Sequence, residues 1–141
     1  MENINLFVYG SLRPNFFNFE KYLDGKTLDI KPAVLKNMNL YHMPYKGYPA
    51  ITPGDDVVFG EVITVKDYDS TVKAIDIMEG FLGENNPANE YHKILVEVEH
   101  IDSSKKEKCY TYFYNRDIDN NFIEQAIYIE HGDWKKYMLE K

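Results

Sequence analysis

The stretch from Leu6 to Tyr9 is the sequence feature that most constrains the fold. Its four residues are all apolar or aromatic, without the polar alternation of a half-exposed strand, and Gly10 and Ser11 end the run. A short, continuously apolar strand bounded by turn residues is typical of a strand covered on both faces. We therefore predict a central strand over residues 4–9 that leaves its sheet abruptly.

Strand patterns outnumber helix patterns in the rest of the chain. They occupy residues 27–43, with a break expected near Pro32, and residues 57–65, 91–101 and 108–115, the last two forming a hairpin. Helices are expected over residues 16–23, 69–79 and 121–127. Since strands and helices do not alternate strictly, the pattern favours an α+β fold around a strongly curved, largely antiparallel sheet.

The segment 44–54 is rich in proline and glycine and is flanked or interrupted by Tyr41, Tyr45 and Tyr48. Such a composition predicts a rigid loop, and an aromatic loop is a candidate pocket wall. Near the C-terminus, Gly132 is expected to form a turn, Asp133 to cap a helix and Trp134 to fill the core.

Length and charge narrow the classes of function. The 141 residues favour one domain, 1–141, and the formal net charge of −7 disfavours a nucleic-acid partner. No apolar run approaches the ~20 residues of a membrane span, and Cys109 is the single cysteine of the sequence. We expect a cytoplasmic protein, with Cys109 as a packing residue of a strand.

Glu79 stands out because an apolar residue is expected at its position. Val72, Ile75 and Glu79 lie at i, i+3 and i+7 of the predicted helix, and hence on one face. Burial and the negative end of the helix dipole would both make this carboxylate a stronger base than a surface glutamate. Spacing alone equally allows a carboxylate turned to solvent at a frayed helix end.

The turn after the first strand is a second candidate. If Gly10 adopts a positive φ, the N–H groups of Gly10, Ser11 and Leu12 can converge on a carboxylate or an oxyanion. Taken by itself, a strand followed by Gly-Ser is more often a plain turn that binds nothing.

Other chemistries have less support. Ser11 is an alternative nucleophile, but the Gly-x-Ser-x-Gly pattern is missing and nothing in the sequence places His131 and Asp133 beside it. The histidines lack paired ligand spacing and there is no cysteine pair, so no metal site is expected. Glycine-rich nucleotide-binding patterns are also missing, so no cofactor is expected.

Ten short segments, spread along nearly the whole chain, carry a family resemblance. They are Phe7–Pro14, Tyr22–Gly25, Pro32–Leu35, Leu40–Tyr41, Tyr48–Ile51, Val58–Val62, Asp76–Phe81, Tyr91, Tyr110–Tyr112 and Ile129–Trp134. In this order and at these separations, they resemble the gamma-glutamylcyclotransferase-like family, and most nearly its gamma-glutamylamine cyclotransferase branch.

The resemblance implies a small mixed, largely antiparallel β-barrel flanked by short helices. It also implies an enzyme that cyclises a gamma-glutamyl amine or amino acid to 5-oxoproline and releases the amine, with Glu79 as general acid and base. The candidate substrate-binding residues are Tyr9, Gly10, Ser11, Leu12, Pro49, Tyr91 and Tyr112. The expected partner is a small-molecule gamma-glutamyl substrate, with no cofactor, nucleic acid or membrane, and the expected oligomeric state is a monomer.

Three positions depart from the family pattern. Asn15 replaces a common glycine, and asparagine tolerates the left-handed conformation. Lys93 replaces a common arginine, which removes a planar fork of donors. His131 replaces a small residue. Two alternatives remain open: a non-catalytic module of the same scaffold that binds small anions, and an amide hydrolase that depends on Ser11.

Overall fold

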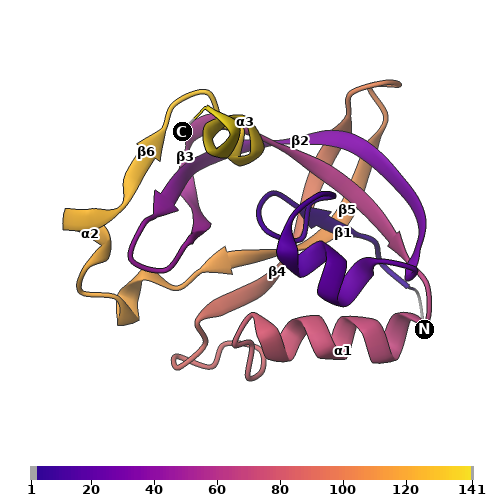
Figure 1. Cartoon of the computed structure of the whole chain (residues 1–141), viewed down its shortest axis with the longest axis horizontal. Coiled ribbons are helices and arrows are strands. Elements are labelled where there is room, and N and C mark those ends of the chain that lie inside the picture. The colour runs from indigo at the N-terminus through magenta and orange to yellow at the C-terminus, as the bar shows by residue number, and fades with distance from the viewer. Residues whose placement is uncertain (1–2, 141) are drawn as a thin grey trace.

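The computed structural model describes residues 3–140, and its main feature is a small closed β-barrel (Figure 1). The strands are β1 (Leu6–Val8), β2 (Thr27–Met43), β3 (Tyr48–Val65), β4 (Tyr91–His100), β5 (Lys106–Tyr114) and β6 (Ile127–Ile129). They follow the order β3-β1-β5-β4-β2-β6, and a further pairing of β3 with β2 closes five of them into a ring. The β1–β5 pair is parallel and the other described pairs are antiparallel, so the predicted mixed, largely antiparallel α+β barrel is confirmed.

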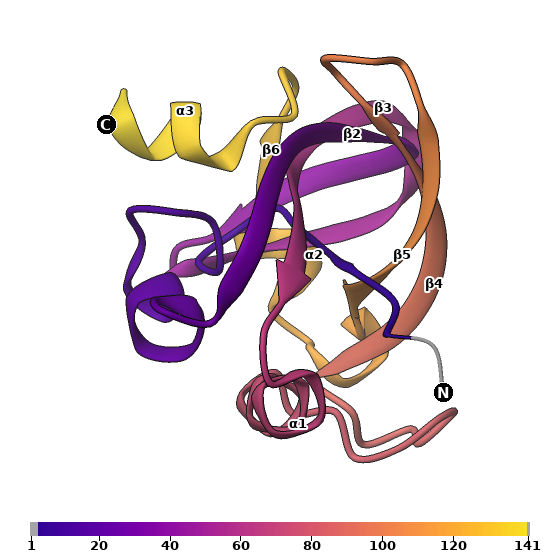
Figure 2. The same ribbon diagram turned by 90° about the vertical axis from the view of Figure 1, so that its right-hand side faces the viewer.

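Short helices flank this barrel. They are η1 (Phe19–Leu23), α1 (Tyr68–Met78), η2 (Arg116–Ile118), α2 (Phe122–Gln125) and α3 (Trp134–Leu139). In both views α1 lies at one end of the molecule and α3 at the other (Figure 2). Among residues 3–140, no helix combines the length and the apolar character that crossing a membrane requires.

The strand β1 occupies the central position that its composition predicted. It pairs with β3 on one side and β5 on the other. Leu6 and Val8 belong to the core cluster that includes α1, whereas Phe7 and Tyr9 belong to the cluster that includes Trp134. Because both faces of the strand are covered, a polar residue within it would lose its hydration without a partner.

Two expected interruptions of the sheet are wrong. The strand β2 runs unbroken through Pro32, which pairs in register with Glu61 and accepts a 3.0 Å hydrogen bond from the Ile101 N–H. The segment 44–54 is mostly strand, since only residues 44–47 form a turn and β3 begins at Tyr48.

Sheet geometry explains why β3 tolerates two prolines in its early part. Pro49 and Pro53 pair with β2, whereas β1 reaches β3 only at residues 61–63. The early part of β3 is therefore an edge on its other side, and a missing N–H there breaks no ladder.

The C-terminal turn matches its prediction. Gly132 has a φ of +75°, and a Cβ atom at this position would lie 1.8 Å from the Val57 carbonyl oxygen. The Asp133 carboxylate accepts a 3.1 Å hydrogen bond from the Lys136 N–H, and Trp134 is buried. The β4–β5 hairpin and the buried Cys109 also lie where the sequence placed them.

Candidate active site

A cavity of about 320 Å³ lies between the loop that follows β1 and the C-terminal end of α1. All eight residues singled out from the sequence line it: Tyr9, Gly10, Ser11, Leu12, Pro49, Glu79, Tyr91 and Tyr112. Further lining residues include Phe7, Val8, Phe17, Asn18, Lys46, Tyr48, Met78 and Glu90. The fold thus gathers the candidates from the loop after β1, from β3, β4 and β5, and from the end of α1 into one space.

The loop Tyr9–Leu12 is held from its outer side. The Gly10 carbonyl accepts from the Arg13 N–H at 2.9 Å, and the Ser11 carbonyl accepts from the Phe19 N–H at 3.0 Å. The Asn18 amide donates to Ser11 Oγ at 2.7 Å. Asn15 has the left-handed φ, +79°, that its residue type allows.

Gly10 is needed for space rather than for an unusual backbone angle. The expected positive φ is wrong, because Gly10 is not among the glycines in that region. A Cβ atom at Gly10 would instead lie 2.6 Å from Pro49 Cγ and 2.9 Å from Pro49 Cδ. The glycine therefore lets the loop approach the start of β3 closely.

This loop presents hydrogen-bond donors to the cavity. The N–H groups of Gly10, Ser11 and Leu12 donate to no acceptor within residues 3–140, although all three residues line the cavity and are buried. Buried backbone donors are almost always paired. Three successive unpaired donors beside a cavity form a site suited to a carboxylate or an oxyanion.

Arg13 fixes the loop to the body of the molecule. Its guanidinium donates to both carboxylate oxygens of Glu61, at 2.8 and 2.9 Å, and to Asp133 Oδ1 at 2.8 Å. The side chain is nearly fully buried. Sequence reasoning gave Arg13 no such role, since nothing in the sequence placed it beside Glu61 or Asp133.

Glu79 lies at the opposite end of the cavity, directly after α1. Val72 and Ile75 are buried, as expected for the inward face of α1 that their spacing predicted. Gly80, whose φ is +69°, follows directly after Glu79 and turns the chain away from the helix, and the Glu79 carbonyl accepts from the Tyr91 N–H at 3.2 Å. Asp67 precedes the helix, and its side chain binds Lys26 at 3.1 Å and makes no capping hydrogen bond.

The environment of Glu79 makes its carboxylate a weak acid. Burial raises its pKa from 4.5 to about 8, and the neighbouring carboxylates of Glu90 and Asp76 add to the effect. No hydrogen-bond donor from residues 3–140 contacts the Glu79 carboxylate. The geometry therefore supplies the raised basicity that the sequence could only suggest.

Four tyrosines line the cavity, and each directs its hydroxyl proton to an acceptor within the protein. Tyr9 donates to the Tyr112 carbonyl at 2.6 Å, and Tyr91 donates to the Pro49 carbonyl at 2.6 Å. Tyr112 donates to Asp76 Oδ1 at 2.5 Å, and Tyr48 donates to Glu90. These phenols can therefore offer a ligand only acceptor oxygens.

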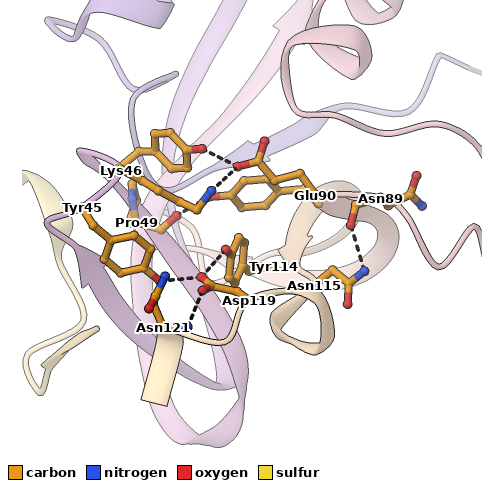
Figure 3. A network of polar contacts seen from close by, with 11 residues as sticks. Tyr45, Lys46, Pro49, Asn89, Glu90, Tyr114, Asn115, Asp119 and Asn121 are labelled. Carbon is orange, nitrogen blue, oxygen red and sulfur yellow. Dashed lines mark hydrogen bonds and ion pairs between the residues drawn. The ribbon is translucent and has the colours of Figure 1, made fainter. Parts of the chain in front are cut away.

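Glu90 and Asp76 are the carboxylates that sequence reasoning missed. Glu90 accepts from Tyr48 and, at 3.2 Å, from Lys46 Nζ (Figure 3). Asp76 precedes Glu79 by three residues, and this helical spacing was a usable signal. Glu90 lies in a polar loop, and no periodicity marks it.

A third carboxylate, Asp119, holds the turn that carries Lys46. It accepts from the hydroxyl groups of Tyr45 and Tyr114, both at 2.5 Å, and from the Asn121 N–H at 2.9 Å (Figure 3). These contacts join the β2–β3 turn to β5 and to the segment before α2.

The structure does not assemble a serine triad. Ser11 Oγ accepts from Asn18, and the Asp133 carboxylate accepts from Arg13 rather than from an imidazole. The ring of His131 accepts from the Asp133 N–H. Within residues 3–140, no hydrogen bond connects Ser11 to His131 or Asp133.

The fold is thus that of a small closed barrel in which a loop of backbone donors and a buried carboxylate share one cavity. The chain belongs to the gamma-glutamyl cyclotransferase, AIG2-like family, whose model matches residues 6–136. This confirms the resemblance that the sequence motifs carried.

Individual relatives agree with this membership. The chain is 32% identical to the gamma-L-glutamyl-butirosin B gamma-glutamyl cyclotransferase of Niallia circulans, over 96% of this chain and 78% of that protein. It is 35% identical to protein AIG2 C of Arabidopsis thaliana, over 97% of this chain and 75% of that protein. The crystal structure of an AIG2-like protein from Mus musculus shares the fold with a TM-score of 0.70 at 18% identity, covering 90% of this chain and 86% of that one.

Proposed function

We propose that this protein converts a gamma-glutamyl amine or amino acid to 5-oxoproline and the free amine. The observation that carries the proposal is the pairing of a basic, donor-free Glu79 carboxylate with three unpaired N–H groups in one cavity. Such a cavity offers a place for both a proton and an anion. The family membership supports the same reaction class.

The first step is a proton transfer. A protonated α-amine has no lone pair with which to attack its own γ-carbonyl, so Glu79 accepts one of its protons. The α-amine of the substrate lies beside its own carboxylate and is more basic than the N-terminus of a peptide. A Glu79 pKa of about 8 is much closer to that basicity than the ordinary 4.5, so the transfer costs far less free energy than it would with a surface glutamate.

The second step closes the ring. The freed α-amine nitrogen forms a bond to the γ-carbonyl carbon of the same molecule, so no second reactant has to be captured. Glu79, now protonated, gives its proton to the leaving nitrogen, and the tetrahedral intermediate expels the amine as the carbon–nitrogen bond to it breaks. The ring nitrogen then loses its remaining extra proton through the same carboxylate to the departing amine, so a single carboxylate serves every proton transfer.

The loop Tyr9–Leu12 holds the negative part of the substrate in this proposal. Its donors are fixed by Arg13 and Asn18 before the substrate arrives, so little reorganisation is needed on binding. Pro49, Tyr91 and Tyr112 shape the wall that faces the glutamyl carbon chain. The cavity requires no metal or cofactor for these steps.

The test is the identity of the product. Wild-type protein is incubated with a panel of gamma-glutamyl amines and amino acids, and 5-oxoproline and glutamate are separated by chromatography. We expect 5-oxoproline with the wild type and also with Ser11→Ala. Release of glutamate, lost in Ser11→Ala, would show an amide hydrolase, and binding without any product would show a non-catalytic module.

A further inference from the structure

At the helix end of the cavity, three acceptors receive no donor from residues 3–140: the Glu79 carboxylate and the hydroxyl oxygens of Tyr91 and Tyr112. The hydroxyl protons of both tyrosines are directed away to other acceptors. The side-chain donors nearby are engaged elsewhere, Lys46 by Glu90 and the Asn18 amide by Ser11 and Met78. A ligand at this end is satisfied only if it brings its own N–H or O–H groups. A primary ammonium has three such donors and the positive charge to match Glu79.

The Asp76 carboxylate determines the direction in which the Tyr112 hydroxyl group donates its hydrogen bond. Its Oδ1 accepts from the Tyr112 hydroxyl at 2.5 Å, and its Oδ2 accepts from Lys93 Nζ at 3.2 Å. Lys93 also lies over the ring of Tyr110, 4.8 Å from its centroid. The Asp76 carboxylate is therefore held from two sides in the orientation that draws the proton of Tyr112.

We propose that Asp76 is a positioning residue, which turns the Tyr112 oxygen into an acceptor for the α-ammonium of the substrate beside Glu79. This inference rests on the proposed function and extends it, because it assigns the two ends of the glutamyl head. The ammonium lies at Glu79 and Tyr112, and the α-carboxylate lies at the N–H groups of Gly10, Ser11 and Leu12. Reversing the head would bring a carboxylate against the Glu79 carboxylate and the Tyr112 oxygen, which are both acceptors.

The contacts of Lys93 also explain its place in the site. Its partner is the carboxylate that orients Tyr112, so Lys93 acts on the site only through Asp76. An ammonium in this position neutralises Asp76 without donating to the cavity, since Lys93 is not among its lining residues.

The test compares a substrate with a matched analogue. The substrate is a gamma-glutamyl alkylamine, and the analogue is the corresponding glutaric acid monoamide, in which hydrogen replaces the α-amine. Steady-state kinetics are measured for the wild type, Tyr112→Phe, Asp76→Asn and the double variant at about pH 9, where Glu79 is ionised. Tyr68→Phe is the control, because Tyr68 also donates to an acceptor within the protein, the Ile4 carbonyl, but lies outside the cavity lining.

We expect Tyr112→Phe to raise KM by roughly 10-fold or more, the value of a hydrogen bond to a charged group, with little change in kcat. Its inhibition constant for the analogue should stay within about twofold, since the analogue has no ammonium. Asp76→Asn should also raise KM. The double variant should have nearly the same KM as Tyr112→Phe alone, because both substitutions remove the same acceptor.

Three results would overturn the inference. An unchanged KM in Tyr112→Phe would show that the oxygen does not bind the substrate. An equal loss of affinity for substrate and analogue, or independent effects of the two substitutions, would show a purely structural role. In either case, 5-oxoproline release by the wild type would still support the proposed function. A wild type that forms no 5-oxoproline would overturn both proposals.

Discussion

The two ends of the cavity are opposite in character. At the loop Tyr9–Leu12 the polar groups are backbone donors, fixed by Arg13 and unpaired toward the cavity. At the end of α1 they are acceptors, with Glu79 free of donors and Tyr112 directed toward Asp76. The difference teaches why we propose a zwitterionic substrate head for this site: the rigid end suits a negative charge, and the basic end suits a proton donor.

Removing the basic end should have the largest effect. Glu79→Gln keeps the shape of the side chain but cannot accept the proton, so turnover should fall by roughly 10²–10⁴-fold. The assay is 5-oxoproline release, with thermal unfolding as the control for folding. Turnover near the wild-type level in a folded Glu79→Gln protein would place the base elsewhere.

Displacing the donor end should have the next largest effect. In Gly10→Ala the new methyl group meets Pro49, so the loop must shift, and kcat/KM should fall by about 100-fold for a displacement near 1 Å. Because the clash is with the Pro49 ring, adding Pro49→Ala should restore part of the activity. No rescue by Pro49→Ala would mean that Gly10 acts in another way.

The charge at the basic end predicts a pH profile. Glu79 must be ionised to accept a proton, so kcat/KM should fall about tenfold per pH unit below its pKa of about 8. Glu90→Gln removes the neighbouring carboxylate that contributes most to this shift after burial, so the acid limb should move to lower pH. If the acid limb of the profile stays at the same pH in Glu90→Gln, that limb does not report the ionisation of Glu79.

The last prediction concerns stability rather than activity. The pKa of Glu79 is raised in the folded chain, so its contribution to stability is complete below about pH 4 and is lost as the pH rises through about 8. Glu79→Gln should therefore unfold near the wild-type Tm at pH 4 and roughly 15 °C above it at pH 9. A Tm difference that is the same at both pH values would show that ionisation of Glu79 costs the fold nothing.

Much of the fold was predictable because β1 carries an unambiguous pattern. Its apolar run identified a strand covered on both faces, and Val72 and Ile75 identified the face of α1 that packs on the core, at whose end Glu79 lies. The extent of β3 was not predictable, since Pro49 and Pro53 indicate a loop unless the edge position of that segment is known.

The finer structure of the site depends on contacts between distant segments. Glu90 belongs to a polar loop, and only its contacts with Lys46 and Tyr48 bring it to the cavity. The direction in which Tyr112 donates depends on Asp76, a residue 36 positions away. No local pattern encodes such a direction, whereas the presence of tyrosine in the wall was visible in the composition.

The pKa of Glu79 tests the central claim most directly. It can be measured by following the side-chain carboxyl carbon of Glu79 by NMR over a pH titration of ¹³C-glutamate-labelled protein, with Glu79→Gln to assign the signal. Burial of Glu79 beside the Glu90 and Asp76 carboxylates predicts a midpoint of about 8. A midpoint near 4.5, the ordinary value for glutamate, would contradict the assignment of Glu79 as the base.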